Sequence, residues 1–515
     1  MRNIHRSLVI GCSLLALAGC GPDDIASPGT GGNITINYPP SPTPTAPTPT
    51  PTPPSSLVTP ATGCPTIADP QGLTDSGTIT GPTGEWRVCT LPAKLNVSST
   101  LEKLPGLLYR MGGRVDVGTD GGFFADNSDG LSDTNVTLTI RPGVIVFGGT
   151  GVSWLAVNRG NKIHAVGEPT QPIIFTSRDN VLGLNNDTSM GQWGGVVLLG
   201  RGRTTDCAFG TVDADTCERN TEGAAEPAIF GGRDDTYDAG SMKYVQLRYS
   251  GYVLGANSEL QSLTPGSIGT GTTLEYIMSL NSSDDGVEFF GGQANMKYYI
   301  GIGSDDDSLD VDTGARVQIQ HALIVQREGA GDSLLEIDSN GNESNNPRTD
   351  LKVSNFTFIQ RKAGNTNASS LFYRGNSDVH LMNGIVISPT NSCLGIHNNF
   401  ATADFRSVVM QCGTPIYRDG GSAAAGTASG FFGNGANNNN DNYTPTLTNL
   451  FINGANEGAV TPFNANGLSS FFDTVTHIGA VKDSADNWYA GWTCNSATAN
   501  FGAGNSGNCT SLPVT

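Results

Sequence analysis

The chain has 515 residues, with 28 Lys and Arg against 47 Asp and Glu, and its formal net charge at pH 7 is −19. Charged residues make up only 15% of the chain, whereas glycine is abundant, with 68 copies. This acidic balance argues against nucleic acid, or an anionic lipid surface, as the partner of the folded part, and it suits a protein that collects cations.

The chain begins with the layout of a secretory signal. Basic residues precede an apolar segment at residues 8–17, which is too short to form a stable membrane span. The segment ends in Leu17-Ala18-Gly19-Cys20, which resembles the bacterial lipobox, a cleavage motif whose cysteine is acylated. The resemblance implies that residues 1–19 are a lipoprotein signal peptide and that Cys20 carries the lipid.

The same resemblance gives an expected location. The residue after Cys20 is Gly21, rather than the Asp that usually keeps such lipoproteins at the inner membrane. We therefore expect a lipid-anchored protein of the cell outer membrane. Whether it faces the periplasm or the cell surface is left open. Several acyl chains would hold it stably, where a single chain would not.

A proline-rich linker follows the lipid site. Residues 38–60 are almost wholly Pro, Thr and Ser, so they have no apolar surface to bury and favour an extended polyproline conformation. At about 3.1 Å per residue such a segment reaches roughly 70 Å. We therefore interpret residues 20–60 as a lipid-anchored linker that holds the folded body away from the membrane.

Cysteine usage agrees with export. Besides Cys12 in the signal and Cys20, eight cysteines remain, and they form four pairs of sequence neighbours. An even count in an exported chain indicates disulfides, and the absence of C-x-x-C spacing argues against a metal site. Other connectivities stay open, but nearest-neighbour pairing predicts Cys64–Cys89, Cys207–Cys217, Cys393–Cys412 and Cys494–Cys509.

The body repeats a short pattern. Segments of alternating apolar and polar residues recur between stretches rich in Gly, Asn, Asp and Ser, which indicates strands separated by turns. The spacing is 22 residues from Leu274 to Met296 and 21 from Met296 to Val317, and no long amphipathic helix is evident. This period favours the coils of a parallel β-helix over a sandwich or a propeller. The segments begin at Leu138, Met242, Leu274, Met296, Val317, Leu351, Val379 and Phe405.

We therefore predict an all-β fold, a parallel β-helix with loop insertions and capped ends. The bare end of a β-helix is an exposed sheet edge and has to be covered. We assign residues 61–110 to an N-terminal cap, 111–430 to the β-helix, and 431–515 to C-terminal coils and a cap. Aromatic residues at 488, 489 and 492 fit that capping role.

Three successive coils carry an aspartate-led motif. The motifs are Asp285-Gly-Val-Glu288, Asp307-Ser-Leu-Asp310-Val-Asp312 and Asp332-Ser-Leu-Leu-Glu336-Ile-Asp338. Neighbouring parallel strands lie about 4.8 Å apart, so equivalent carboxylates would stack in a column. Such a column repels itself unless it is protonated, spread by solvent or bridged by a cation.

Oxygen-only ligands with several carboxylates suit Ca²⁺ better than a transition metal. We therefore predict that one or more Ca²⁺ ions bind along this column, although the aspartates could equally form solvated turns. The candidate ligands are Asp284, Asp285, Asp305, Asp306, Asp307 and Asp310. Two further acidic loops, at residues 126–133 and 234–238, are weaker candidates for a calcium loop.

Several segments of the body resemble one known family. They include Gly191-Gln-Trp-Gly-Gly and Asp284-Asp-Gly-Val-Glu, within residues 138–148, 163–177, 191–200, 284–292 and 305–312. Together they are similar to bacterial outer-membrane and secreted β-helix lipoproteins that are often encoded with TonB-dependent receptors. The resemblance implies a right-handed parallel β-helix and an envelope location. Because that family has no settled activity, it implies no catalytic residues, and these stay unknown.

The preferred interpretation is a non-enzymatic binding module. A rigid β face with inserted loops, such as residues 203–240 and 253–272, would present a glycan or a protein ligand, and a TonB-dependent receptor is a possible partner. Calcium would hold the acidic face together. A purely structural envelope protein is one alternative.

The other alternative is an enzyme acting on an acidic glycan. A glycoside hydrolase needs two carboxylates at a defined separation, which stacked coils could supply. A calcium-dependent polysaccharide lyase would need a base near the ion, and Lys297, Arg316 and Arg327 are the candidates. Binding without turnover of an acidic glycan would separate the module from either enzyme.

Overall fold

The computed structural model describes residues 57–514, apart from residues 223, 225, 256–257, 340, 342–343, 365–368, 399–401 and 503–505. The chain divides into residues 1–54 and 55–515, and the description concerns the second unit. The signal peptide, Cys20 and nearly all of the linker lie outside the described residues. Among those that are described, no helix is long and apolar enough to cross a membrane.

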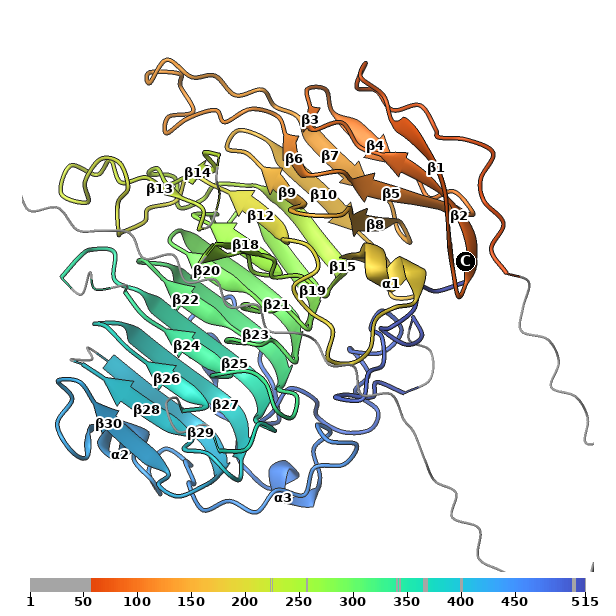
Figure 1. The fold of residues 1–515 in the computed structure, drawn as a ribbon. Helices are drawn as coiled ribbons and strands as arrows, with labels where there is room; N and C mark the ends of the chain where they lie inside the picture. Colours follow the sequence, from red (N-terminus) through yellow and green to blue (C-terminus); the bar gives the residue numbers. More distant parts are fainter. Residues whose placement is uncertain are drawn as a thin grey trace, which may run out of the picture. The chain divides into compact units, whose positions relative to one another are not determined.

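Two long, mainly parallel sheets hold most of the regular structure (Figure 1). Sheet A contains β1 (Thr74–Gly81), β2 (Gly84–Thr90), β4 (Ser99–Leu101), β5 (Leu107–Met111), β7 (Thr137–Ile140), β8 (Ile145–Gly148), β10 (Lys162–Val166), β11 (Ile173–Ser177), β15 (Gly240–Arg248), β19 (Thr273–Leu280), β21 (Gln293–Ile302), β23 (Arg316–Val325), β25 (Asp350–Ile359), β27 (Asp378–Ser388) and β29 (Thr402–Cys412). Sheet B contains β3 (Lys94–Leu95), β6 (Arg114–Val117), β9 (Trp154–Val157), β12 (Val196–Leu199), β18 (Leu263–Gly266), β20 (Glu288–Phe290), β22 (Asp310–Asp312), β24 (Leu335–Ile337), β26 (Leu371–Tyr373), β28 (Leu394–His397) and β30 (Tyr417–Gly420).

The connectivity is that of a parallel β-helix. From β19 to β30 the chain alternates between one strand of sheet A and one of sheet B, and each strand pairs in parallel with its counterpart on the next coil. The predicted all-β fold is therefore confirmed. All eight strand segments expected from the alternating pattern lie in sheet A.

The strands of sheet A bend at a column of left-handed residues. Tyr244, Tyr276, Tyr298 and His321 have positive φ in the middle of β15, β19, β21 and β23, and Asn355, Asn383 and Ser407 continue the column. The rings of Tyr244, Tyr276 and Tyr298 stack with centroids 4.3 Å apart. In the preceding coil the chain is interrupted at the position of this bend. Two separate strands stand there, and β10 pairs with the first half of β15 while β11 pairs with the second.

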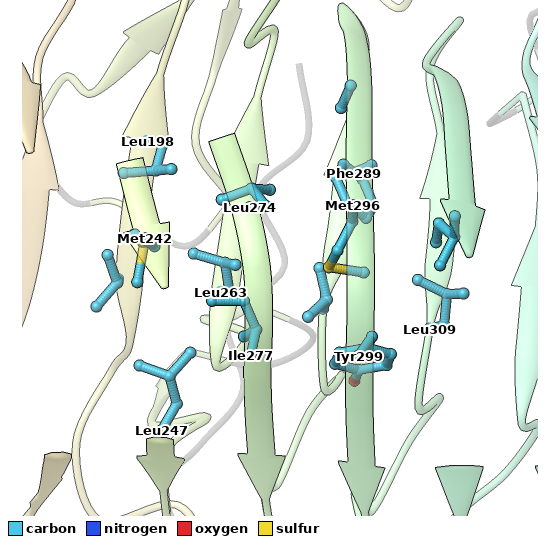
Figure 2. Close-up of a cluster of buried hydrophobic side chains, with 14 of the residues drawn as sticks. Leu198, Met242, Leu247, Leu263, Leu274, Ile277, Phe289, Met296, Tyr299 and Leu309 are labelled. Atoms are coloured by element: carbon cyan, nitrogen blue, oxygen red, sulfur yellow. The ribbon is translucent and has the colours of Figure 1, made fainter. Parts of the chain in front are cut away.

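Apolar side chains from both sheets fill the interior of the coils. Figure 2 shows Leu198, Leu263 and Phe289 from sheet B beside Met242, Leu274 and Met296 from sheet A. Met242, Leu274 and Met296 are successive partners in the ladder, so the core is built from columns of equivalent residues. Burying such columns supplies the main stabilisation of the fold.

Two insertions interrupt the coils. The first insertion, residues 203–239 rather than the expected 203–240 because Gly240 begins β15, contains the hairpin β13 (Arg219–Asn220) and β14 (Ile229–Phe230). The second contains β16 (Val253–Gly255) and β17 (Ser258–Glu259) and ends before β18. It therefore spans residues 253–262 rather than the expected 253–272, because residues 263–266 pair within sheet B.

The ends of the β-helix are covered in different ways. At the N-terminal end β1 pairs antiparallel with β2, and β2 and β5 already belong to the parallel ladder inside the expected cap of residues 61–110. At the C-terminal end α2 (Thr427–Phe432) buries Ala428 and Phe432 in the core. The other short helices are α1 (Arg178–Leu182), α3 (Ala455–Gly458) and the 3-10 turn η1 (Ala465–Gly467).

Residues 440–502 and 506–514, called the C-terminal strap, differ from the expected coils and cap. The strap leaves the last coil where Asn440 bridges Val409, and it runs back along the outer face of sheet A until Leu512 packs near Trp86. The physical reason is the apolar outer face of sheet A. Ile300 and Leu323 are fully buried there against strap residues.

The four predicted disulfides are confirmed. Cys64–Cys89 ties the first residues of the body to β2, and Cys207–Cys217 closes a loop in the first insertion. Cys393–Cys412 joins β29 to the turn before β28, and Cys494–Cys509 closes a loop in the C-terminal strap.

Candidate metal centre

The acidic motifs form an array because their strands are in register. Glu288 of β20 pairs with Asp310 of β22, and Asp310 pairs with Glu336 of β24. The alternate residues Phe289 and Val311 point into the core and are fully buried. Strand periodicity therefore places the carboxylates of three neighbouring coils side by side on the outer face of sheet B.

A second row of acids precedes these strands. The backbone N–H of Asp307 donates to Oδ1 of Asp285 at 2.8 Å, and the N–H of Ser333 donates to Oδ1 of Asp307 at 2.6 Å. Each carboxylate is thus fixed by the backbone of the next coil. Asp285 and Asp307 are only 5% exposed, so the row lies inside the molecular surface.

Both rows open into one cavity of about 380 Å³. Two triads in it bring one oxygen of each residue within 4.8 Å of the others: Asp284, Asp285 and Asp306, and Asp285, Glu288 and Asp310. Ten carboxylates and a single guanidinium line the cavity, which makes it strongly acidic. They belong to Glu222, Glu259, Asp284, Asp285, Glu288, Asp306, Asp307, Asp310, Asp332, Glu336 and Arg374.

Two of these carboxylates come from the insertions. Glu222 lies in the first insertion and Glu259 at the end of β17. The first insertion is held by buried Arg159, whose guanidinium lies 2.6 Å from Asp120 and 2.5 Å from Glu218. Apolar contacts between insertion residues, such as Phe230 and Leu260, and the outer face of sheet B hold both insertions against the coils.

Burial and mutual repulsion raise the pKa values of the cavity carboxyls. Loss of solvent is the larger cause, and neighbouring carboxylates add to it. The pKa of Asp284 rises to about 8, that of Glu336 to about 7 and that of Asp306 to about 6. The pKa values of Asp285, Glu288, Asp307 and Asp310 are also raised well above the usual range.

The single guanidinium neutralises only one side of the array. Arg374 lies 2.9 Å from Glu336 and also pairs with Asp338. Glu288, in β20, is 7% exposed, and its carboxylate makes no hydrogen bond or ion pair with any described residue. A buried carboxylate without a partner is strongly unfavourable unless it is protonated or meets a cation.

Five of the six candidate ligands lie together. Asp284, Asp285, Asp306, Asp307 and Asp310 all line the cavity. Asp305 does not, and its carboxylate lies 3.5 Å from the Arg327 guanidinium. The sequence-based candidates did not include Glu288 and Glu336, which also line the cavity and stand in the motifs. No sequence pattern pointed to Glu222 and Glu259.

In each of the weaker acidic loops, one carboxylate accepts hydrogen bonds from nearby backbone N–H groups. Asp129 accepts hydrogen bonds from the backbone N–H groups of Phe124 and Leu131, at 2.9 and 3.0 Å. Asp234 accepts from the N–H of Thr236 at 2.9 Å, as a turn-forming aspartate does.

The basic residues considered for a lyase are also engaged elsewhere. Lys297 pairs with Asp473 at 2.6 Å, and Arg316 pairs with Asp235 at 2.7 Å. Neither of these residues, nor Arg327, is among those that line the cavity. The basic residue nearest to the carboxylates is Arg374, which is already paired.

Comparison with known proteins agrees with the fold. A family model described as a pectate-lyase-like β-helix domain matches residues 127–493 of the 515-residue chain. The chain belongs to this family. No curated protein and no solved structure matches the chain. Membership of the pectate-lyase-like β-helix family fits a carbohydrate-related or structural role, and the matched range contains the whole acidic cavity.

Proposed function

We propose that this protein is a Ca²⁺-binding β-helix module that presents a glycan or a protein ligand at the cell envelope without chemically altering it. One observation carries the proposal: carboxylates from three coils and two insertions converge on a single cavity. A rigid ladder of coils holds them in place, so the cavity is formed before any ion arrives.

The donor set fits Ca²⁺. Only carboxylates and one guanidinium line the cavity, with no His or Cys that would favour zinc. Ca²⁺ takes six to eight oxygens at about 2.3–2.6 Å, so two ligand atoms on opposite sides of one ion lie about 4.6–5.2 Å apart. The oxygens of each triad, all within 4.8 Å of one another, satisfy that limit without rearrangement.

We further propose that the module is tethered to the outer membrane. The lipobox-like segment, Cys20 and Gly21 support lipidation and outer-membrane sorting, and the Pro/Thr-rich linker supports a spacer. A TonB-dependent receptor is the partner that the family resemblance suggests, and a glycan ligand agrees with a carbohydrate-related role of the matched family.

The arrangement of basic residues favours binding over cleavage. A lyase needs a free base beside the ion, whereas Arg374 is held by Glu336 and Asp338. The experiments therefore have to distinguish a binding module from three alternatives: a polysaccharide lyase, a glycoside hydrolase and a purely structural protein.

The test begins with Ca²⁺ and ends with acidic glycans. The mature, non-lipidated chain carrying Cys20→Ser is stripped of metal, titrated with Ca²⁺ by calorimetry and melted in parallel. We expect binding and a higher melting temperature, because a ligand that binds only the folded state stabilises it. No binding at millimolar Ca²⁺ would mean that the cavity carboxyls hold no ion, and it would overturn the calcium-stabilised module.

The second stage uses polygalacturonate and alginate with Ca²⁺ present. Retention of either glycan without new chain ends supports the binding module. Unsaturated ends that absorb in the ultraviolet identify a lyase, new reducing ends alone identify a hydrolase, and both results contradict the proposal.

A further inference from the structure

The two triads in the cavity are not independent, because Asp285 belongs to both. Asp285 lies within 4.8 Å, oxygen to oxygen, of Asp284 and Asp306 in one triad and of Glu288 and Asp310 in the other. Its Oδ1 already accepts the N–H of Asp307 at 2.8 Å, so the carboxylate has a fixed position before any ion binds. A carboxylate offers two oxygens with about four lone-pair sites, enough for this hydrogen bond and two ions.

Positive charge is unevenly distributed over the three coils that line the cavity. At the third coil, Arg374 supplies a guanidinium to Glu336 and Asp338. At the first two coils, no Lys, Arg or His lines the cavity. The repulsion that remains there falls on Asp285 and Glu288, both of which are more than nine-tenths buried.

The buried carboxylate of Glu288 has no partner among the described residues, and this requires a ligand at Glu288. Its carboxylate lines the cavity, it is 7% exposed, and it has no hydrogen bond or ion pair within the described part of the chain. An ion that bound only Asp284, Asp285 and Asp306 would not include Glu288. The volume of about 380 Å³ leaves room for two ions with water to complete their shells, since each water takes about 30 Å³.

We propose that the cavity binds a pair of divalent cations that share the Asp285 carboxylate. The outer ion also binds Asp284 and Asp306, and the inner ion also binds Glu288 and Asp310. This inference rests on the proposed cation binding. It adds the number of ions, their arrangement and the residue that bridges them. Glu259 and Glu222, which line the same cavity, would be drawn to the pair, so ion binding would tie both insertions to the coils.

The experiment uses Ca²⁺ for stoichiometry and Mn²⁺ as a magnetic probe on the mature, non-lipidated full chain. We expect two Ca²⁺ per chain by calorimetry. With two Mn²⁺ bound, we expect a spin-coupled electron paramagnetic resonance spectrum, because a shared carboxylate holds the ions a few ångströms apart. Two ions with the six-line spectrum of isolated Mn²⁺ would overturn the shared Asp285.

Single substitutions assign the two positions. Glu288→Gln should leave one ion and convert the Mn²⁺ spectrum to that of an isolated ion, and Asp306→Asn should do the same from the other side. Asp305→Asn is the matched control, because Asp305 neighbours Asp306 but does not line the cavity, and it should keep both ions.

The melting temperature and the number of bound ions report on different properties of the protein. Glu288→Gln preserves the shape of the side chain and replaces a buried carboxyl that has no partner among the described residues with a neutral amide, so the metal-free variant should melt above the metal-free parent. A single Ca²⁺ per parent chain would overturn the pair and leave the proposed function intact. No Ca²⁺ binding at all would overturn both.

Discussion

Asp284, Asp306 and Glu336 make the stability of the metal-free protein depend on pH. Their pKa values in the folded chain are raised to about 8, 6 and 7, above the values near 4 expected when the chain unfolds. A raised carboxyl pKa means that the folded state binds more protons than the unfolded chain. The stability that these three carboxyls contribute is therefore fully present below pH 4 and is lost as the pH rises towards 8.

We therefore predict that the metal-free protein melts at a higher temperature at pH 6 than at pH 8. Saturating Ca²⁺ should reverse the order, because protons compete with the ion for the same carboxylates. Differential scanning calorimetry of stripped and Ca²⁺-loaded samples measures both effects. An unchanged order on adding Ca²⁺ would show that the ion binds elsewhere.

Gly286 is a second residue with a definite expected effect. A Cβ at this position would lie 2.5 Å from the Ser308 carbonyl oxygen and 2.5 Å from the Tyr299 hydroxyl, both in the neighbouring coil. Gly286→Ala should therefore cost about 1–3 kcal/mol of unfolding free energy and weaken Ca²⁺ binding at the adjacent Asp285.

Gly430 in α2 provides the control, since nothing lies within 4 Å of its Cβ position. Gly430→Ala should be neutral or stabilising by roughly 0.5–1 kcal/mol. Equal effects of the two substitutions in chemical denaturation would contradict the close approach of the coils at Gly286.

At the scale of the element, the C-terminal strap is expected to contribute strongly to stability. Trp492 is fully buried, and its ring lies 6.1 Å from that of Tyr244 and 5.9 Å from that of Tyr276, edge to face. Trp492→Ala should lower the unfolding free energy by about 3–5 kcal/mol. Phe209→Ala, at a side chain that is 54% exposed, should change it by less than about 0.5 kcal/mol. Similar melting temperatures for the two variants would mean that the strap is only loosely attached.

The sequence predicted the long strands of sheet A and missed two other kinds of element. Period-two alternation is visible in strands as long as β23, whereas β20, β22 and β24 have three residues each and an acidic outer face. The strap escaped prediction because its aromatic residues fit a cap equally well. Only the column of left-handed residues and the apolar outer face of sheet A explain where Trp492 packs.

Only part of the candidate site could be predicted from the sequence. Repetition of the motif pointed to Asp285, Asp307 and Asp310, because stacked coils must bring equivalent residues together. The contribution of Glu222 and Glu259 depends on how the insertions fold back over sheet B, which no local pattern encodes. Asp305 stands in the same acidic run, but it pairs with Arg327 and does not line the cavity, which the motif alone did not indicate.

At the scale of the whole molecule, a lipid anchor and a linker would carry the acidic β-helix at a distance from the membrane. Cys20→Ser should move the protein from the outer-membrane fraction to the soluble fraction, because it removes the site of acylation. Cys12→Ser, within the signal peptide, should leave the membrane fraction unchanged. Fractionation followed by mass spectrometry of the mature N-terminus measures both. A membrane-bound Cys20→Ser variant would contradict lipid anchoring.

The acidic cavity of sheet B is proposed to bind divalent cations. Crystals grown with millimolar Ca²⁺, measured at long wavelength for anomalous scattering, test it most directly. We expect two anomalous peaks in the cavity, each about 2.3–2.6 Å from an oxygen of Asp285. An ordered cavity without an anomalous peak, under conditions where Ca²⁺ is in excess, would contradict it.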